Sequence, residues 1–259
     1  MSNEPGTQSE TRTLDELSRR SKQIRRDTLE LGTKNGGYHF GGSFSIVEIL
    51  IALYDIILTA EDRFILSKGH ACWPLYVLLR DRGLNPTLSG HPSLDVANGI
   101  HCTTGSEGHG LPSGIGRAWA RKLEGRGGRI FVLIGDGECQ EGTTWESLLT
   151  ASFRKLDNLV AIVDYNKIQG SGFLDDILPV PMSSLAKIAE VLGWSVETID
   201  GHSHSAILQA LEKRVEGKPR LIVANTVKGK GVSYMEGKPE WHAKFPNPDQ
   251  LAQAYKELA

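Results

Sequence analysis

Residues 131–142 read FVLIGDGECQEG, an apolar run that ends at an acid between two glycines. The run has the character of a buried strand, and a carboxylate at the tip of such a strand loses hydration that a partner must replace. The two glycines leave room for a ligand to approach the backbone closely. A hard cation that carries a phosphate group explains both features, so we expect such a ligand at Asp136.

The chain beyond this stretch alternates between strand-like and helical segments. Apolar strand-like runs occupy residues 130–134, 159–165, 194–199 and 221–226, and helical patterns occupy residues 143–156, 183–193 and 205–215. The apolar runs are nearly continuous, which is typical of strands covered on both faces. This alternation predicts an α/β fold with a doubly wound, mostly parallel sheet and helices on both faces.

The first half of the chain adds helices and one long loop. Helical periodicity covers residues 14–34 and 46–58, and a short strand-like run at 63–67 precedes a helical stretch at 71–83. Residues 83–114 are rich in Gly, Pro, Ser and Thr, and a loop of this length in a compact domain is usually functional. We expect residues 1–12 to be a disordered tail and residues 13–259 to form a single domain.

Composition excludes several classes of function. The 259 residues include 29 basic and 31 acidic ones, with no basic block that would favour nucleic acid or an anionic membrane. The apolar stretch at 47–58 contains acids and is too short to span a bilayer. The N-terminus has no apolar signal segment, and three cysteines without metal-finger spacing indicate reduced thiols. We therefore expect a cytoplasmic protein.

Asp136 and Asn166 are predicted to meet. They lie 30 residues apart, which is the length of one strand-helix-strand unit, and each follows a predicted strand. In doubly wound sheets, ligands bind beyond the carboxyl ends of the strands. A carboxylate and an amide oxygen form an incomplete shell of oxygen ligands that suits Mg²⁺ with phosphate and water. Gly-Asp-Gly is also ordinary turn chemistry, so the strand-end position of both residues carries the prediction.

Six blocks of sequence, in this order, resemble the N-terminal half of transketolases, which are thiamine-diphosphate enzymes. The resemblance runs from about residue 19 to 244. The blocks are YHFGGSFSIVEILIALY (38–54), DRFILSKGHA (62–71), GHPSLDVANGIHCTTGSEGHGLPSGIG (90–116), GDGECQEG through VDYNKIQGSG (135–172), IDGHSHSAI (199–207) and TVKGKGVSYMEGKPEWH (226–242). The resemblance implies the diphosphate-binding domain of the thiamine-diphosphate-binding fold.

The resemblance also implies a cofactor, a metal and the residues that bind them. Mg²⁺, or Ca²⁺ or Mn²⁺ in its place, would be held by Asp136, the Asn166 side chain and the carbonyl of Ile168. Thiamine diphosphate would contact a larger set, in which the amide of Gly137 meets the diphosphate and residues 105–107 meet the rings. The full set is His70, Gly105, Ser106, Glu107, Gly135, Asp136, Gly137, Asn166, Ile168 and His242.

Five residues match the family's catalytic positions. His70 and His242 match histidines near the diphosphate and the reacting centre, and His39 and His91 match histidines that contact sugar hydroxyls. Glu141 matches an acid that links active sites across the interface between protomers. The implied reaction transfers a two-carbon ketol unit from a ketose, often phosphorylated, to an aldose.

The resemblance covers only the first part of full-length transketolases. Their next domain supplies the glutamate that activates the aminopyrimidine ring and much of the phosphate pocket. We therefore expect a split enzyme, in which this chain joins a separate C-terminal-half subunit with the pyrimidine-binding domain, as an α₂β₂ heterotetramer. The chain alone is expected to be inactive.

Three positions depart from the family pattern. Glu107 stands where leucine is usual, and Tyr38 and Phe40 replace the smaller Gly and Pro around the first histidine. A carboxylate at position 107 could change substrate choice, stabilise a cationic ring or mark an impaired copy. Alternative functions are the thiamine-binding subunit of a 2-oxo acid dehydrogenase, half of a deoxyxylulose-phosphate synthase, and a non-catalytic subunit. The SKGHA, GHP and EWH blocks favour a transketolase over the other two enzymes.

Overall fold

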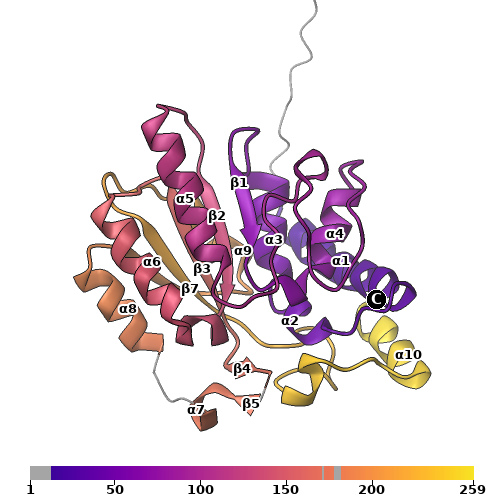
Figure 1. Ribbon diagram of the computed structural model, residues 1–259. Helices are drawn as coiled ribbons and strands as arrows, with labels where there is room; N and C mark the ends of the chain where they lie inside the picture. Colours follow the sequence, from indigo (N-terminus) through magenta and orange to yellow (C-terminus); the bar gives the residue numbers. More distant parts are fainter. Residues whose placement is uncertain (1–12, 171, 178–181) are drawn as a thin grey trace, which may run out of the picture.

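The computed structural model describes residues 13–170, 172–177 and 182–259. Five parallel strands form the central sheet in the order β1-β2-β3-β7-β6 (Figure 1). Their bounds are β1 Arg63–Leu66, β2 Ile130–Gly135, β3 Leu159–Tyr165, β6 Ser195–Asp200 and β7 Arg220–Asn225. The predicted parallel sheet is confirmed, and all four apolar runs from 130 onward are strands.

Helices cover both faces of the sheet, as predicted. One face packs against α5 (Gly110–Leu123), α6 (Gly142–Phe153) and α8 (Met182–Val191), and the other against α1 (Leu14–Lys34), α3 (Val47–Ala52), α4 (Trp73–Arg80) and α9 (His204–Glu212) (Figure 1). Successive residues of β2 enter opposite cores: Val132 joins the first, whereas Phe131 and Leu133 join the second. The connection β6-α9-β7 returns beside β3, which reverses the direction of winding.

Two predicted helices show how local sequence determines helix geometry. The helix predicted over residues 14–34 is α1, whose start is fixed by a capping box between Thr13 and Glu16. The helix predicted over residues 46–58 is not uniform. It is α-helical over Val47–Ala52 and continues as a π-helical turn over Leu53–Ile57, where Leu58 N donates to Leu53 O at 2.8 Å.

The C-terminal segment packs on the first helices. A short 3₁₀ turn at Pro239–His242 and helix α10 (Pro248–Glu257) bring Trp241 and Leu258 into a third apolar cluster with Leu29 of α1 and with α2 (Phe40–Phe44). Gly229 N also donates to Gly41 O at 2.9 Å. These contacts bring the segment that carries His242 against the segment that carries His39.

The small elements between β3 and α8 border the site. Strands β4 (Ile168–Gln169) and β5 (Gly172–Phe173) form an antiparallel pair, and the short helix α7 (Leu174–Ile177) follows them. The tail predicted at residues 1–12 lies outside the described residues. Within the described residues, no helix combines the length and the apolar character that a membrane span needs.

Candidate functional site

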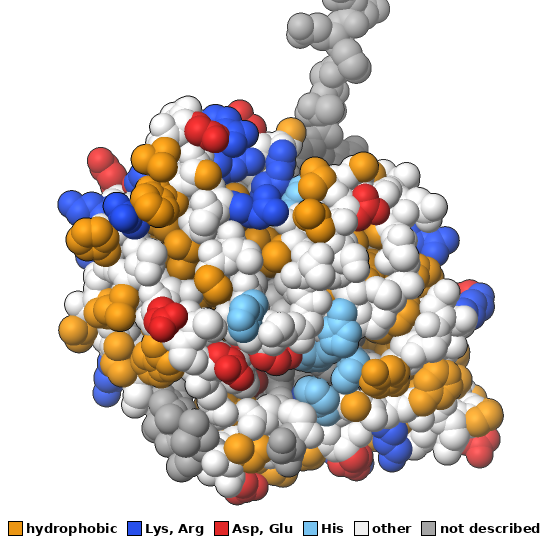
Figure 2. Space-filling model, in the orientation of Figure 1, with side chains coloured by type: hydrophobic (Ala, Val, Ile, Leu, Met, Phe, Trp, Pro, Cys, Tyr) orange, Lys and Arg blue, Asp and Glu red, His pale blue; other side chains and the backbone are white. Residues whose placement is uncertain are grey.

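A cavity of about 300 Å³ lies beyond the carboxyl ends of the strands. Figure 2 shows histidine side chains (pale blue) beside acidic side chains (red) around a hollow near the middle of this face. Nine of the residues implicated by sequence line the cavity: His70, Glu107, Gly135, Asp136, Gly137, Glu141, Asn166, Ile168 and His242. Asp136 and Asn166 thus share one crevice, as their strand-end positions predicted.

Asp136 follows β2 directly and is 2% exposed. Its Oδ1 accepts a hydrogen bond from Gly137 N at 2.9 Å, and its Oδ2 accepts one from Lys167 N at 2.5 Å. Burial, followed by repulsion from Asp164, raises its pKa to about 7. A carboxylate whose ionised form is this unfavourable gains from a nearby cation, so the residue fits the metal-binding role.

The two other oxygens implied as metal ligands lie beside Asp136. Asn166 Oδ1 accepts from Ile168 N at 3.1 Å, and the Ile168 carbonyl accepts from Lys228 Nζ at 3.0 Å. The candidate metal ligands on Asp136, Asn166 and Ile168 are all oxygen atoms, which suits Mg²⁺, Ca²⁺ or Mn²⁺. Within the described residues, no group of three or more His, Cys, Asp or Glu is placed to hold a metal. A cation here therefore needs oxygens from a ligand such as a diphosphate to complete its shell.

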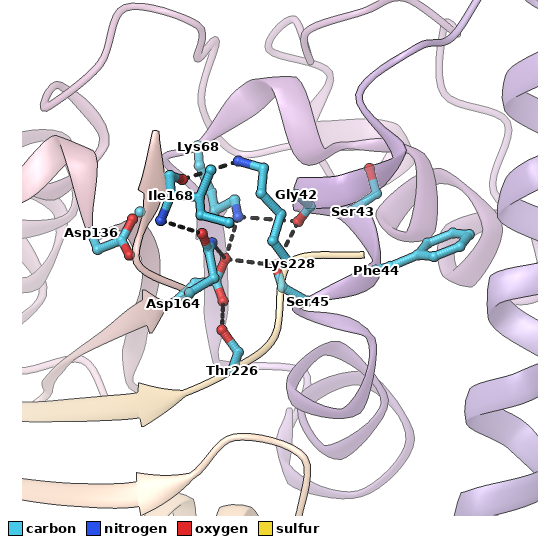
Figure 3. A network of polar contacts seen from close by, with 12 residues as sticks. Gly42, Ser43, Phe44, Ser45, Lys68, Asp136, Asp164, Ile168, Thr226 and Lys228 are labelled. Carbon is cyan, nitrogen blue, oxygen red and sulfur yellow. Dashed lines mark hydrogen bonds and ion pairs between the residues drawn. The ribbon is translucent and has the colours of Figure 1, made fainter. Parts of the chain in front are cut away.

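We call Asp136, Asn166, the Ile168 carbonyl, Lys68 and Lys228 the floor of the cavity. Asp164 does not line the cavity, but it is hydrogen-bonded to two of these residues, Lys68 and Asn166 (Figure 3). It is fully buried and accepts hydrogen bonds from Ser45 Oγ at 2.7 Å, Asn166 Nδ2 at 2.8 Å, Thr226 Oγ1 and Lys68 Nζ. Burial by itself would raise its pKa, but Lys68, Thr226 and Ser45 lower it below the ordinary value. Because Asn166 donates to Asp164, its side-chain oxygen is left to act as the acceptor.

Two buried lysines complete the polar floor, and sequence reasoning missed both. Lys68 and Lys228 are 1% and 2% exposed, and they extend toward the space between Ile168 and Gly42 (Figure 3). Burial, followed by the charge of Lys68, lowers the pKa of Lys228 to about 8. Two cations beside a metal site suit a polyanionic ligand. The sequence does contain a feature that points to both lysines, because each lies just after a strand-like run: Lys68 after β1 and Lys228 after β7.

Glu138 was also missed. Its Oε1 accepts from Ser67 Oγ at 2.6 Å and from Gly108 N at 2.8 Å, and its Oε2 accepts from Gly135 N at 2.8 Å. It is fully buried, and burial raises its pKa to about 7. Glu138 thereby fastens the loop that contains Glu107 to the end of β2.

The four histidines predicted to act together lie together. Ring centroids are 5.2 Å apart for His39 and His70, 5.3 Å for His39 and His242, 5.1 Å for His70 and His242, and 6.4 Å for His39 and His91. Burial lowers the pKa of His39, lowers that of His70 well below 6.5, and brings that of His242 to about 2. These three rings are therefore neutral near pH 7.

Hydrogen bonds fix the tautomers of two of the rings. His39 Nδ1 lies 2.6 Å from His242 O, a carbonyl that can only accept, so this nitrogen carries the proton. Lys228 Nζ lies 2.9 Å from His242 Nδ1, and an ammonium can only donate, so the proton of His242 is on Nε2. His39 therefore offers an acceptor at Nε2, whereas His242 offers a donor there.

Of the remaining predicted residues, Glu141 lines the cavity, whereas Gly105 and Ser106 do not. Gly105 has a φ of +141°, and a Cβ on it would be 3.1 Å from His91 Cδ2, so the two are in close contact. Ser106 is exposed, its Oγ lies 3.3 Å from His109 Nδ1, and it does not line the cavity. Glu141 is exposed at the start of α6. The roles of these residues stay predictions.

Comparison with known proteins identifies the family. The family described as "Transketolase, thiamine diphosphate binding domain" matches residues 22–258. The chain is 40% identical to one of the subunits of the apulose-4-phosphate transketolase of Actinobacillus succinogenes, over 94% of this chain and 96% of that protein. It is 38% identical to "6-deoxy-6-sulfo-D-fructose transketolase subunit SqwG" of Clostridium sp., over 94% and 96%.

Solved structures agree with this assignment. The crystal structure of transketolase from Campylobacter jejuni superposes with a TM-score of 0.81 at 26% identity, over 93% of this chain. The chain spans only 42% of that protein, whereas it matches the Actinobacillus and Clostridium subunits along nearly their whole length. The chain belongs to the transketolase family and is built on the thiamine diphosphate binding domain of that family.

Proposed function

We propose that the chain is one half of a split transketolase, which transfers a two-carbon ketol unit from a ketose to an aldose acceptor. The observation that carries the proposal is the cavity, because it combines an oxygen-ligand cation site with neutral histidines of opposite tautomer. Residues 13–259 would act as a single diphosphate-binding domain.

The residues of the floor fit thiamine diphosphate with Mg²⁺. Asp136, the Asn166 side chain and the Ile168 carbonyl would hold the metal, with Ca²⁺ or Mn²⁺ as substitutes. Lys68 and Lys228 would balance the charge of the diphosphate. When bound, thiamine diphosphate supplies a carbanion that adds to a ketone and stores electrons after the bond is cleaved.

The histidines would move protons between substrate hydroxyls and the protein. His39 Nε2 can accept a proton from a hydroxyl, whereas the Nε2–H of neutral His242 can donate a hydrogen bond to a substrate oxygen, because hydrogen bonds fix their tautomers. Burial lowers the pKa of both rings, so near pH 7 His39 keeps a free acceptor nitrogen and His242 stays neutral while its N–H contacts a substrate oxygen. His91, against the Gly105 loop, would contact the sugar.

The names of the relatives support a companion chain. The Actinobacillus and Clostridium relatives, which match nearly end to end, are both named as subunits of a transketolase. The companion would be a C-terminal-half subunit with the pyrimidine-binding domain, joined in an α₂β₂ heterotetramer. The relatives are named for apulose-4-phosphate and 6-deoxy-6-sulfo-D-fructose. A ketose with a phosphate or sulfonate group is therefore the proposed donor.

Native mass spectrometry of the tagged chain, purified gently from its own host, tests this proposal. We expect a complex with a second chain, thiamine diphosphate and a divalent metal. That complex, but not the chain alone, should transfer ketol units when phosphorylated and sulfonated ketoses are offered with aldoses. A homodimer that binds no thiamine diphosphate and shows no transfer would contradict the proposal.

A further inference from the structure

Glu107 brings a carboxylate to the wall of the cavity, beside His70. It lines the cavity, and its Oε1 lies 3.2 Å from His70 Nδ1. Its loop is fixed at the next residue, because Gly108 N donates to buried Glu138 at 2.8 Å and Gly108 O accepts from Thr143 Oγ1 at 2.9 Å. The backbone on which Glu107 stands is thus held at the cavity wall.

The side chain of Glu107 is 45% exposed, and the charges of Lys68 and Lys228 act on its carboxylate only from beyond ion-pair distance. Among the described residues, no lysine or arginine forms an ion pair with Glu107, and its one contact of that kind is His70. That ring is neutral near pH 7, because burial and the nearby lysines hold its pKa well below 6.5. The lysines of the cavity are engaged elsewhere: Lys68 on Asp164 and Gly42 O, and Lys228 on Ile168 O and His242.

An unpaired carboxylate on a cavity wall favours a cationic group in the cavity. With the diphosphate held by Asp136, Asn166 and the two lysines, the remaining part of the cofactor would face lining residues that include His70, His242 and Glu107. That remaining part contains the thiazolium ring, which carries a permanent positive charge.

We propose that Glu107 recognises the positive charge of the thiazolium ring, so that this chain binds the cationic cofactor better than an uncharged analogue. The inference rests on the proposed function. It makes Glu107 a cofactor-binding residue whose contribution is electrostatic, in place of the apolar contact that leucine would give. The rival explanation is that Glu107 only holds the ring of His70 in place.

The experiment compares two ligands that differ in ring charge. Dissociation constants for thiamine diphosphate and its uncharged deaza analogue are measured by calorimetry with Mg²⁺, on the full chain together with the companion that co-purifies with it. Glu107→Gln keeps the size and removes the charge, Glu107→Leu removes both polar atoms, and Glu107→Asp keeps the charge. Glu212→Gln, an exposed acid outside the cavity, is the matched control.

For Glu107→Gln and Glu107→Leu we expect thiamine diphosphate to bind about two- to fivefold more weakly, as expected for one partly solvated charge pair. The deaza analogue should bind as it does to the unchanged protein, and Glu107→Asp and Glu212→Gln should keep the original ratio of the two constants. An equal loss for both ligands, or no loss for either, would overturn the assignment. If the unchanged protein binds neither ligand, the proposed function fails, and this inference fails with it.

Discussion

Asp136 shows how one residue can oppose stability and serve binding. Its carboxylate is 2% exposed, and burial together with Asp164 makes its ionised form unfavourable. Two backbone amides from different segments nevertheless point at its oxygens. A group placed in this way has most to gain from a bound cation.

Replacing Asp136 with asparagine should separate these two effects. Loss of even an outer-shell partner of a metal ligand costs about 10–100-fold in affinity, so Asp136→Asn should weaken metal-dependent binding of thiamine diphosphate about 100-fold or more. The Tm of the unliganded protein should change little, because removal of the buried charge offsets the loss of one of the two hydrogen bonds that the carboxylate accepts. Calorimetry and thermal unfolding measure the two quantities, with exposed Asp249→Asn as the control. Unchanged affinity in Asp136→Asn would rule out the metal assignment.

Sequence reasoning found the residues of the site that end a strand or sit in a histidine block. Asp136 and Asn166 follow β2 and β3 and were predicted to meet, and the structure places them in one cavity. Lys68, Lys228 and Asp164 were missed for a physical reason. Lysine and aspartate are usually exposed, and only the tertiary structure shows that these three are buried, with Lys68 paired to Asp164 and Lys228 bonded to Ile168 O and His242.

At the scale of elements, the turn after β7 presents Lys228 to the cavity. Gly229 has a φ of +78°, and a Cβ there would lie 2.5 Å from Met235 O. The backbone also bonds Gly41 of α2, so the turn joins the third apolar cluster to the site. The position of Lys228 therefore depends on a glycine beside it.

Glycine-to-alanine substitutions test this dependence. Gly217 has a similar φ of +69° but open space around it, so Gly217→Ala should cost about 1 kcal/mol in unfolding free energy from backbone strain alone. Gly229→Ala adds a steric clash and should cost about 3 kcal/mol. It should also weaken thiamine diphosphate binding, whereas Gly217→Ala should not. Urea unfolding and calorimetry measure these effects, and equal costs for both variants would contradict the packing argument.

Helices α1 and α3 are joined by a buried ion pair. Arg25 donates to both oxygens of Glu48, at 2.7 and 2.8 Å, and the two side chains are 4% and 7% exposed. Arg25→Met leaves the carboxylate of Glu48 buried without its main partner and should cost about 3–5 kcal/mol. Arg19→Met, on the exposed side of α1, should change stability by less than about 0.5 kcal/mol. Similar small losses for both would show that the pair is not what holds the helices together.

The same pair predicts a pH dependence. Burial by itself would raise the pKa of Glu48, but Arg25 and then His202 bring it to about 2, compared with an ordinary value of 4.5. A lowered pKa stabilises the folded state above the unfolded-state pKa, and this contribution is lost as the pH falls from 4.5 toward 2. Glu48→Gln should therefore flatten the decline in unfolding free energy across this window. An unchanged slope would count against the pair as its source.

Element positions were predictable to different degrees. The strands were predicted from nearly continuous apolar runs, and the helix at 14–34 from its periodicity. The structure confirms both, and it shows a capping box at the start of the helix. The change from α to π geometry at Leu53 has no such signal in the sequence, and in the structure this turn contains Asp55, which pairs with Arg20 of α1 and with Arg82 after α4. Tertiary contacts decide such details.

At the scale of the whole molecule, the winding of the sheet gathers the ends of the strands at one cavity. Sequence alone predicted a doubly wound sheet but not that β7 lies between β3 and β6. This placement brings Thr226 and Lys228 beside Asp164. The order of strands is set by long-range packing, which local periodicity does not encode.

Ligand binding should stabilise the whole chain by mass action. Thiamine diphosphate with Mg²⁺, at 100 times its dissociation constant, should add about 2.7 kcal/mol to the unfolding free energy and raise Tm by about 5–10 °C. Removal of the metal by a chelator should reverse the shift, and added Mg²⁺ should restore it. Differential scanning calorimetry measures the shift. A shift that persists in full with the chelator would show that binding does not need the metal.

The hydrogen bonds that converge on Asp164 have a consequence for the kinetics of cofactor binding. The donors come from four segments: after α2 (Ser45), after β1 (Lys68), after β3 (Asn166) and after β7 (Thr226). Because protein hydrogen bonds hold these segments to one another, capture of the cofactor should require no prior rearrangement of these residues. Its association rate would then rise in proportion to cofactor concentration, without the plateau that a slow opening step imposes.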